Sequence, residues 1–261
     1  MKKIRIFFTL LTFILLLFCI QRSVYAAYPN LHGKSLTTPV AWGNAYGTIF
    51  MGAAYTDPGL YTPNSDGALA IGLGVGDPYD NIGIQTILIA QDISDFGDRF
   101  ALNAQAFRSV GNGAAIGVGV ENINIVDDNP DRPADSDESY YLVFSQGVGG
   151  DAFVNYDTNR SKLHYSVGVG SGRFGEKSEK DVFEGKGKDG TYVFCNVSYE
   201  LFDAFNVIAD WNGVNLNAGI SRNFLISDSV PFVITLGAAD LTDNSGDGVR
   251  FIASVGTGFR L

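Results

Sequence analysis

The sequence predicts an all-β fold, an antiparallel transmembrane β-barrel of about twelve strands, with ten to fourteen strands as the range that fits. Apolar residues alternate with glycine or polar residues over runs of roughly 8 to 13 residues, which Gly, Asp, Asn and Pro interrupt. These runs approach the ~9–11 residues that a tilted strand needs to cross a bilayer. Beyond residue 26 no stretch reaches 18 apolar residues, so membrane-spanning helices are excluded there.

Twelve runs carry this alternation. In one of them Val214, Leu216, Ala218 and Ile220 form an apolar face opposite Asn215, Asn217, Gly219 and Ser221. The expected strands are 44–55, 67–76, 81–91, 99–109, 114–125, 139–147, 162–170, 190–201, 204–211, 214–223, 231–240 and 249–261. An even number agrees with bacterial single-chain barrels, and short connections mostly alternate with long ones, as between the two ends of such a barrel. The connection over 148–161 breaks that alternation.

A soluble exported β-sandwich is the alternative fold, in which the apolar faces would pack against a second sheet. Two features favour the barrel. The chain ends inside an alternating run, and aromatic residues gather at strand ends, as in the interfacial girdles of membrane barrels. These aromatic residues are Tyr46, Tyr55, Phe100, Tyr140, Tyr141, Tyr165, Phe202 and Phe205.

The first 26 residues have the features of an export signal. Basic residues precede the apolar run Phe7–Ile20, and Val24 and Ala26 supply small residues where a signal peptidase cleaves. We therefore expect residues 1–26 to be a signal peptide, residues 27–43 to be a periplasmic segment or a lumen plug, and residues 44–261 to form the barrel. This organisation places the chain in the outer membrane of a Gram-negative cell, in contact with lipid and lipopolysaccharide.

Composition excludes several classes of function. Acidic residues outnumber basic ones 28 to 18, which argues against a nucleic-acid partner because phosphate binding needs clustered Lys and Arg. Two cysteines and two histidines provide neither a disulfide framework nor a zinc cluster. No cofactor and no metal site is expected from these counts.

The last residues, Gly256-Thr257-Gly258-Phe259-Arg260-Leu261, resemble the C-terminal signal of outer-membrane barrels. The resemblance implies that Gly256, Phe259 and Leu261 form an assembly signal recognised by the barrel assembly machinery. Leu261 stands where phenylalanine is commoner. The segment Leu36–Gly43 and the stretch Val207–Gly213 are similar to parts of the YjbH-type outer-membrane proteins associated with exopolysaccharide. That second resemblance covers two short stretches and implies a role near polysaccharide export.

One pair of residues is compatible with catalysis. His164 and Ser166 have the spacing of the His-x-Ser pair in outer-membrane lipases, where the histidine activates the serine. In those enzymes an Asn follows the serine and the pair faces lipid, whereas here Val167 follows and Tyr165 occupies the apolar face. We therefore expect both side chains to line the lumen, and we expect no enzyme activity.

Two acidic connections could hold cations. Residues 127–138 contain six carboxylates, which could collect the divalent cations that bridge lipopolysaccharide, but a solvated loop stiffened by proline is the expected structure. Asp243-Asn244-Ser245-Gly246-Asp247-Gly248 matches the opening of a calcium loop, but Ser254 stands at the position of the closing glutamate. A turn rich in Asp, Asn and Gly is the expected structure.

Polar residues on the inward faces are the candidate binding residues, with glycines between them that leave room for a ligand or an occupying segment. They are Asn103, Gln105, Glu121, His164, Asn196, Glu200, Asp210, Asn215, Asn217 and Arg250. Asp210, Asn215 and Asn217 share one hairpin and should cluster. The leading hypothesis is a porin-like channel for neutral or cationic solutes, since Asp210 and Glu121 make the lumen acidic. The alternative is a non-conducting structural or polysaccharide-secretion accessory barrel, and the remote one is a lipid hydrolase.

Overall fold

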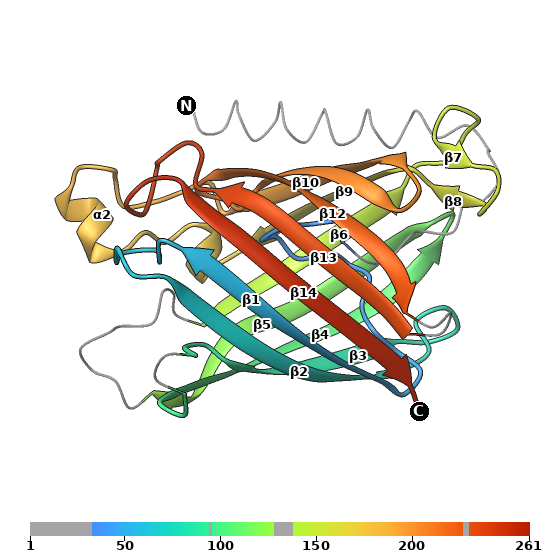
Figure 1. The fold of residues 1–261 in the computed structure, drawn as a ribbon, viewed down its shortest axis with the longest axis horizontal. Coiled ribbons are helices and arrows are strands. Elements are labelled where there is room, and N and C mark those ends of the chain that lie inside the picture. Colours follow the sequence, from blue (N-terminus) through green and yellow to red (C-terminus); the bar gives the residue numbers. More distant parts are fainter. Residues whose placement is uncertain (1–32, 94–95, 128–137, 227–229) are drawn as a thin grey trace.

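A computed structural model describes residues 33–93, 96–127, 138–226 and 230–261, which form a closed antiparallel β-barrel (Figure 1). The predicted signal peptide, residues 1–26, lies outside the described residues. The strands of the barrel are β1 (Thr48–Asp57), β2 (Asp66–Gly76), β3 (Gly83–Ala90), β4 (Arg99–Gly111), β5 (Ala114–Asp127), β6 (Ser139–Gly147), β9 (Leu163–Gly170), β10 (Val193–Phe202), β11 (Phe205–Trp211), β12 (Leu216–Ile226), β13 (Val230–Ala239) and β14 (Arg250–Arg260). The twelve-strand barrel predicted from the sequence is confirmed.

Apart from β1 and β14, which close the barrel, each barrel strand pairs with its neighbours in sequence, with one exception. Strand β6 pairs with β9, because β7 (Val154–Asn155) and β8 (Arg160–Ser161) form a separate two-stranded hairpin in the connection between them. The other short elements are the 3-10 turn η1 (Gly172–Phe174) and the helix α2 (Glu179–Phe183), both in the connection between β9 and β10. No helix in the described ranges is long and apolar enough to cross a membrane.

The barrel closes where β1 pairs with β14 from Thr48↔Arg260 to Asp57↔Phe251. We call the end where β1 begins and β14 stops the terminal end, at the right in Figure 1, and the opposite end the loop end. The loop end carries α2 and the long connection between β9 and β10. Of the C-terminal pattern, Gly256 and Phe259 lie on β14 and Leu261 directly follows it, and the Phe259 side chain is exposed.

Two predicted strand boundaries are wrong for a shared reason. The first strand begins at Thr48 instead of residue 44, and β10 begins at Val193 instead of residue 190. Tyr46 (φ 58°) and Tyr192 (φ 58°) adopt a left-handed backbone just before these strands. That conformation breaks an extended run, and it is uncommon for a tyrosine, so the alternation of the sequence does not reveal it.

Period-2 alternation gives the wall two chemically different faces. Ile71, Val118 and Leu142 point outward and are more than half exposed. On the inner face Gln105, Asn196 and many other polar residues are buried. Soluble monomers rarely expose apolar surface of this extent, whereas membrane barrels show an apolar outer face and a polar interior.

Candidate functional site

Residues 33–46, which we call the inner segment, run inside the barrel (Figure 1). Near the terminal end the Lys34 ammonium donates a hydrogen bond to the Asn206 side chain, at the beginning of β11. The chain then reaches Asp210, further along β11. It returns past the wall to Tyr46, which precedes β1. The inner segment is therefore a loop whose two limbs both start from the terminal end.

The Asp210 carboxylate holds the turn of this loop. One oxygen accepts hydrogen bonds from the backbone N–H groups of Leu36 (3.0 Å) and Thr37 (2.8 Å). The other accepts from the Thr37 hydroxyl (3.1 Å) and from the Asn217 amide (2.7 Å). Asp210 is buried, and hydrogen bonds to a charged group are stronger than neutral ones. We call residues 35–38 the apex of the inner segment.

Arg173 contacts the apex from the other side. Its guanidinium donates to the Thr37 carbonyl oxygen (3.0 Å) and pairs with the Glu121 carboxylate on β5 (2.5 Å). A further bond joins the Asn196 amide to the Thr38 hydroxyl (2.9 Å). Because Arg173 belongs to η1, the connection between β9 and β10 reaches from the loop end into the lumen and touches the inner segment.

The returning limb is bonded to the wall along its length. Side chains that point inward from the neighbouring strands β3 and β4 and from β6 pair with its backbone. These bonds are Gln105 Nε2 to the Val40 oxygen (2.7 Å), the Ala41 N–H to Ser145 Oγ (2.7 Å), and the Asn44 N–H to Gln85 Oε1 (2.9 Å). Gln85 also donates to Gln105 (2.7 Å), so the wall residues support each other.

Inward glycines make room for the inner segment. A Cβ atom on Gly74 would collide with the backbone of Asn44, and one on Gly117 would lie 3.3 Å from the Ala41 Cα atom. On Gly219 it would lie 3.0 Å from the Leu36 side chain. The sequence pattern predicted a ligand space or an occupying segment beside such glycines. At these positions the inner segment is among the neighbours, together with wall atoms at Gly117 and Gly219.

His164 and Ser166 both point into the lumen. The His164 ring meets the Trp42 ring of the inner segment edge to face, with centroids 5.6 Å apart. The Ser166 hydroxyl shares a hydrogen bond with the Ser145 hydroxyl (2.7 Å). Both residues are buried, and their neighbours Trp42 and Ser145 are buried as well.

The remaining predicted lumen residues do not all lie in one place. Asp210 and Asn217 cluster as expected, but Asn215 lies at the loop end, where its amide donates to Asp240 (3.0 Å). Arg250 pairs with the same Asp240 carboxylate (2.6 Å). Two others serve the wall and its rim: Asn103 accepts a bond from the Asn122 N–H, and Glu200 accepts one from Asn155.

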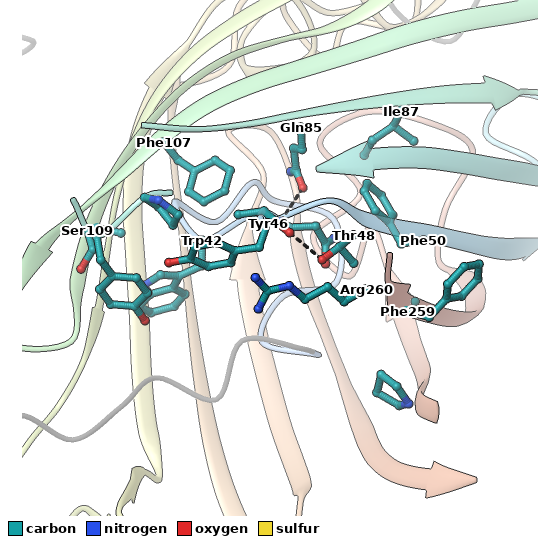
Figure 2. Close-up of a pocket in the computed structure, with 18 residues that line it drawn as sticks. Trp42, Tyr46, Thr48, Phe50, Gln85, Ile87, Phe107, Ser109, Phe259 and Arg260 are labelled. Atoms are coloured by element: carbon teal, nitrogen blue, oxygen red, sulfur yellow. Dashed lines mark hydrogen bonds between the residues drawn. The ribbon is translucent and has the colours of Figure 1, made fainter. Parts of the chain in front are cut away.

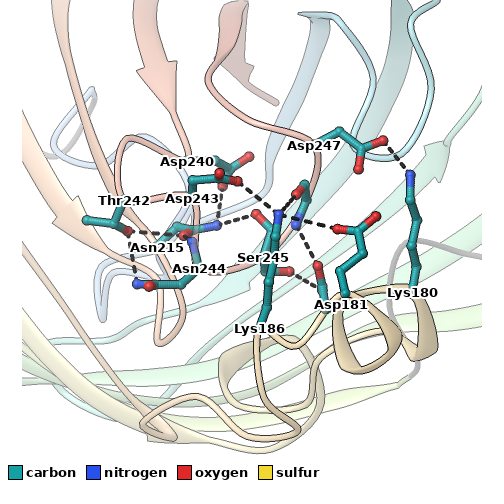
Figure 3. A network of polar contacts seen from close by, with 12 residues as sticks. Lys180, Asp181, Lys186, Asn215, Asp240, Thr242, Asp243, Asn244, Ser245 and Asp247 are labelled. Atoms are coloured by element: carbon teal, nitrogen blue, oxygen red, sulfur yellow. Dashed lines mark hydrogen bonds and ion pairs between the residues drawn. The ribbon is translucent and has the colours of Figure 1, made fainter.

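Connections from opposite sides of the barrel meet at the loop end, at Asp181 of α2. Its carboxylate accepts hydrogen bonds from the hydroxyls of Tyr61 (2.7 Å) and Ser245 (2.6 Å) and from the Gly246 N–H (2.9 Å). Figure 3 shows how α2 and the connection between β13 and β14 join there. Tyr61 adds the connection between β1 and β2.

Electrostatics at this junction favour the charged forms. Burial of the Asp181 carboxylate would raise its pKa, but hydrogen bonds from Ser245, Tyr61, Gly246 and Ser178 outweigh burial and hold the pKa below its usual value. The Lys186 ammonium donates to the Asp243 carboxylate (3.0 Å), and this bond raises the pKa of Lys186. The Asp and Asn residues that resembled a calcium loop are therefore bonded within the chain.

Cavities lie beside the inner segment in the described part of the chain. One of about 730 Å³ lies at the terminal end (Figure 2). A second of about 220 Å³ borders Glu121 and Tyr141, and a third of about 270 Å³ borders Leu36 and Tyr55. No group of three or more His, Cys, Asp or Glu side chains among the described residues could hold a metal ion. Residues 128–137 of the acidic connection lie outside the described residues.

The sequence did not identify several residues that build this site. They are Lys34, Thr37, Thr38, Gln85, Ser145, Arg173, Asn206 and Asp240. Four of these lie at inward positions of the period-2 alternation, so the sequence pattern could have identified them: Gln85, Ser145, Asn206 and Asp240, which stands at a strand end. Lys34 and Arg173 lie in irregular segments, where no alternation indicates which side chains point inward.

No protein-family model matches this sequence, and no curated protein matches it. Solved structures with a similar fold include outer membrane phospholipase A from Escherichia coli, at 13% identity and a TM-score of 0.45, covering 82% of this chain and 97% of that one. They also include the NanC porin, at 9% identity and a TM-score of 0.44, covering 82% of this chain and 100% of that one. A third is LpxR from Salmonella typhimurium, at 8% identity and a TM-score of 0.38, covering 81% of this chain and 100% of that one. Likeness at this level says nothing about the site, and the proposals below rest on this chain's own residues.

Proposed function

We propose that this chain is an outer-membrane barrel whose lumen is closed by the inner segment and which conducts no steady ion current. It is then a structural or polysaccharide-secretion accessory barrel, in contact with lipid and lipopolysaccharide and assembled by the barrel assembly machinery. The observation that carries the proposal is the set of hydrogen bonds between the buried Asp210 carboxylate and the apex backbone at Leu36 and Thr37.

The polar lumen supports closure because its charged groups bind each other. Glu121 pairs with Arg173, and Asp240 pairs with Arg250. Asp210, the residue that would select cations in an open pore, already accepts bonds from the inner segment. A satisfied network of this kind stabilises a filled interior, and releasing it would leave buried polar groups unpaired.

Planar-bilayer recording of the refolded barrel tests the proposal. We expect no steady conductance from the wild-type chain. A variant that lacks residues 33–43 should conduct, because its lumen no longer holds the inner segment, and co-sedimentation of the wild-type chain with lipid verifies that the silent barrels are inserted. Asp210→Ala should conduct intermittently, while Asp243→Asn, which alters an exposed carboxylate at the loop end, should remain silent. Steady wild-type current with a cation preference that Asp210→Asn reduces would instead establish the porin-like channel.

Gated passage is the second candidate, and one observation favours it. Arg173 joins the connection between β9 and β10 to the Thr37 carbonyl of the apex, so a change at the loop end can reach the inner segment. In that case Arg173→Gln should convert a silent barrel into one with brief openings of uniform size. A silent Arg173→Gln barrel would leave only the permanently closed form.

We also propose that the chain is not a lipid hydrolase. His164 and Ser166 point away from the apolar outer face, where a lipid substrate would lie, and Ser166 bonds to Ser145. Any phospholipid hydrolysis by the purified barrel should therefore be unchanged in His164→Ala. A loss of hydrolysis in that variant, with an intact barrel on an unboiled gel, would contradict this.

A further inference from the structure

The cavity at the terminal end has the features of a small-molecule site. Its volume of about 730 Å³ lies within the ~300–1,000 Å³ of typical ligand pockets. The inner segment from Trp42 to Tyr46 forms one wall, and the strands β1, β3 and β4 with the end of β14 form the others (Figure 2). It lies next to the segment that closes the lumen.

One positive charge faces this cavity. Arg260, at the end of β14, extends towards Tyr46, with its guanidinium 5.0 Å from the centre of that ring (Figure 2). No carboxylate is among the lining residues, and no acidic side chain in the described part of the chain pairs with Arg260. Asp77, which approaches the Tyr46 hydroxyl, accepts from it (2.8 Å) and from the Tyr79 N–H (2.9 Å). In a chain of net charge −10, this pocket lining is locally cationic.

The walls are aromatic and held in place. Phe107 is buried and lies against Gly43 and Gly83, where a Cβ atom would approach its ring to 2.5 Å. Trp42 packs edge to face on His164. Rings fixed in this way present flat apolar surface to a ligand without losing side-chain freedom on binding.

From this combination we infer that the terminal-end cavity binds an amphipathic organic anion, with its ring or apolar body between the aromatic walls and its carboxylate or phosphate on Arg260. An arginine pairs with both kinds of anion through parallel N–H groups. The inference is independent of whether the barrel conducts, because the cavity opens at the terminal end without crossing the apex.

The test is calorimetry on the full barrel in lipid nanodiscs, with empty nanodiscs subtracted. The probes are 2-naphthoate, 2-naphthyl phosphate and the neutral 2-naphthylmethanol. We expect both anions to bind and the neutral probe to bind at least tenfold more weakly, since it loses the charge-assisted bond, worth about 1.5–3 kcal/mol. Arg260→Gln should weaken anion binding to the level of the neutral probe. Arg222→Gln, which removes an exposed arginine near the same end but outside the cavity, should leave binding unchanged.

Preference for phosphate over carboxylate, or the reverse, identifies the headgroup that the site takes. Equal binding of the neutral probe, or unchanged binding in a folded Arg260→Gln barrel, would overturn the inference. Binding that appears only after deletion of residues 27–32 would show that the chain's own N-terminal segment occupies the cavity, which also overturns it. Because the three probes are compared on the wild-type chain, the test stands even where Arg260→Gln fails to fold.

Discussion

The Tyr61 hydroxyl and the Asp181 carboxylate lie 2.7 Å apart, although they come from opposite sides of the barrel. Tyr61 belongs to the connection between β1 and β2, and Asp181 to the connection between β9 and β10. In the closed ring these two strand pairs face each other across the lumen. A direct bond between them therefore bridges the loop end, above the apex of the inner segment.

This bridge predicts acid-sensitive loops. Hydrogen bonds hold the pKa of Asp181 below its usual value, so the stability that Asp181 contributes is present above the ordinary Asp pKa of about 3.9 and is lost as the pH falls through the lower, folded-state pKa. We expect proteolysis of the connection between β9 and β10, measured with an acid-active protease, to rise steeply in that window. In Asp181→Asn the connection should be cleaved faster than in the wild type by a second protease that is active at neutral pH, and cleavage by the acid-active protease should change little as the pH falls.

Asp247→Asn is the matched control. Asp247 pairs with Lys180 on the same helix, but both side chains are well exposed, and such pairs contribute about 0–1 kcal/mol. Its cleavage profile should follow that of the wild type. If Asp181→Asn and the wild type show the same acid midpoint, Asp181 does not hold the bridge.

A second prediction concerns the link from the loop end to the apex. Arg173→Gln removes the ion pair with Glu121 and shortens the donor to the Thr37 carbonyl oxygen. We expect faster amide hydrogen exchange at residues 35–38, because the apex then loses its bond to the Arg173 guanidinium. Each lost bond to a charged group is worth about 1.5–3 kcal/mol, so exchange there should rise at least tenfold.

Arg250→Gln separates this effect from a general loss of charge pairing. Arg250 makes a similar, largely buried ion pair with Asp240, yet it does not touch the inner segment. Exchange at the apex should be nearly unchanged in this variant. Equal effects of the two substitutions would mean that Arg173 stabilises the barrel as a whole and not the apex.

The strands were accessible to sequence reasoning because each carries a long, regular period. Asp210 and Asn217 were expected to meet, since a tight turn pairs the strands that hold them, and their register is Asp210↔Asn217. The partners of this pair were not accessible. Thr37 and Arg173 lie far away in sequence, in segments without a period. Only the closed barrel brings Thr37 to the Asp210 carboxylate and Arg173 to the Thr37 carbonyl oxygen.

The glycines of the wall give a third prediction. Gly74→Ala places a methyl group against the Asn44 backbone, which cannot move aside without shifting the inner segment. We expect the returning limb to be displaced, seen as faster hydrogen exchange at Asn44 and Ala45. Overpacking of this kind costs about 1–3 kcal/mol. Gly147→Ala, also an inward glycine, brings its Cβ atom no closer than 3.2 Å to Ser161 and should leave that exchange unchanged.

A fourth prediction tests whether the apolar outer face lies in a bilayer. Ile71 is near the middle of β2, points outward and is 52% exposed. If this face met water, an arginine at position 71 would barely change the stability of the barrel. In a bilayer, Ile71→Arg should lower the free energy of unfolding by about 2–4 kcal/mol, measured by urea titration in lipid vesicles, because the charge lies near the midplane. Ile93→Arg, in the connection that follows β3, should cost no more than about 1 kcal/mol. Equal, small effects at both positions would mean that the outer face meets water or a protein partner. The difference between the stability losses at positions 71 and 93 distinguishes lipid from water or a protein partner better than either loss alone. Both residues are exposed, but they would lie at different depths in a bilayer.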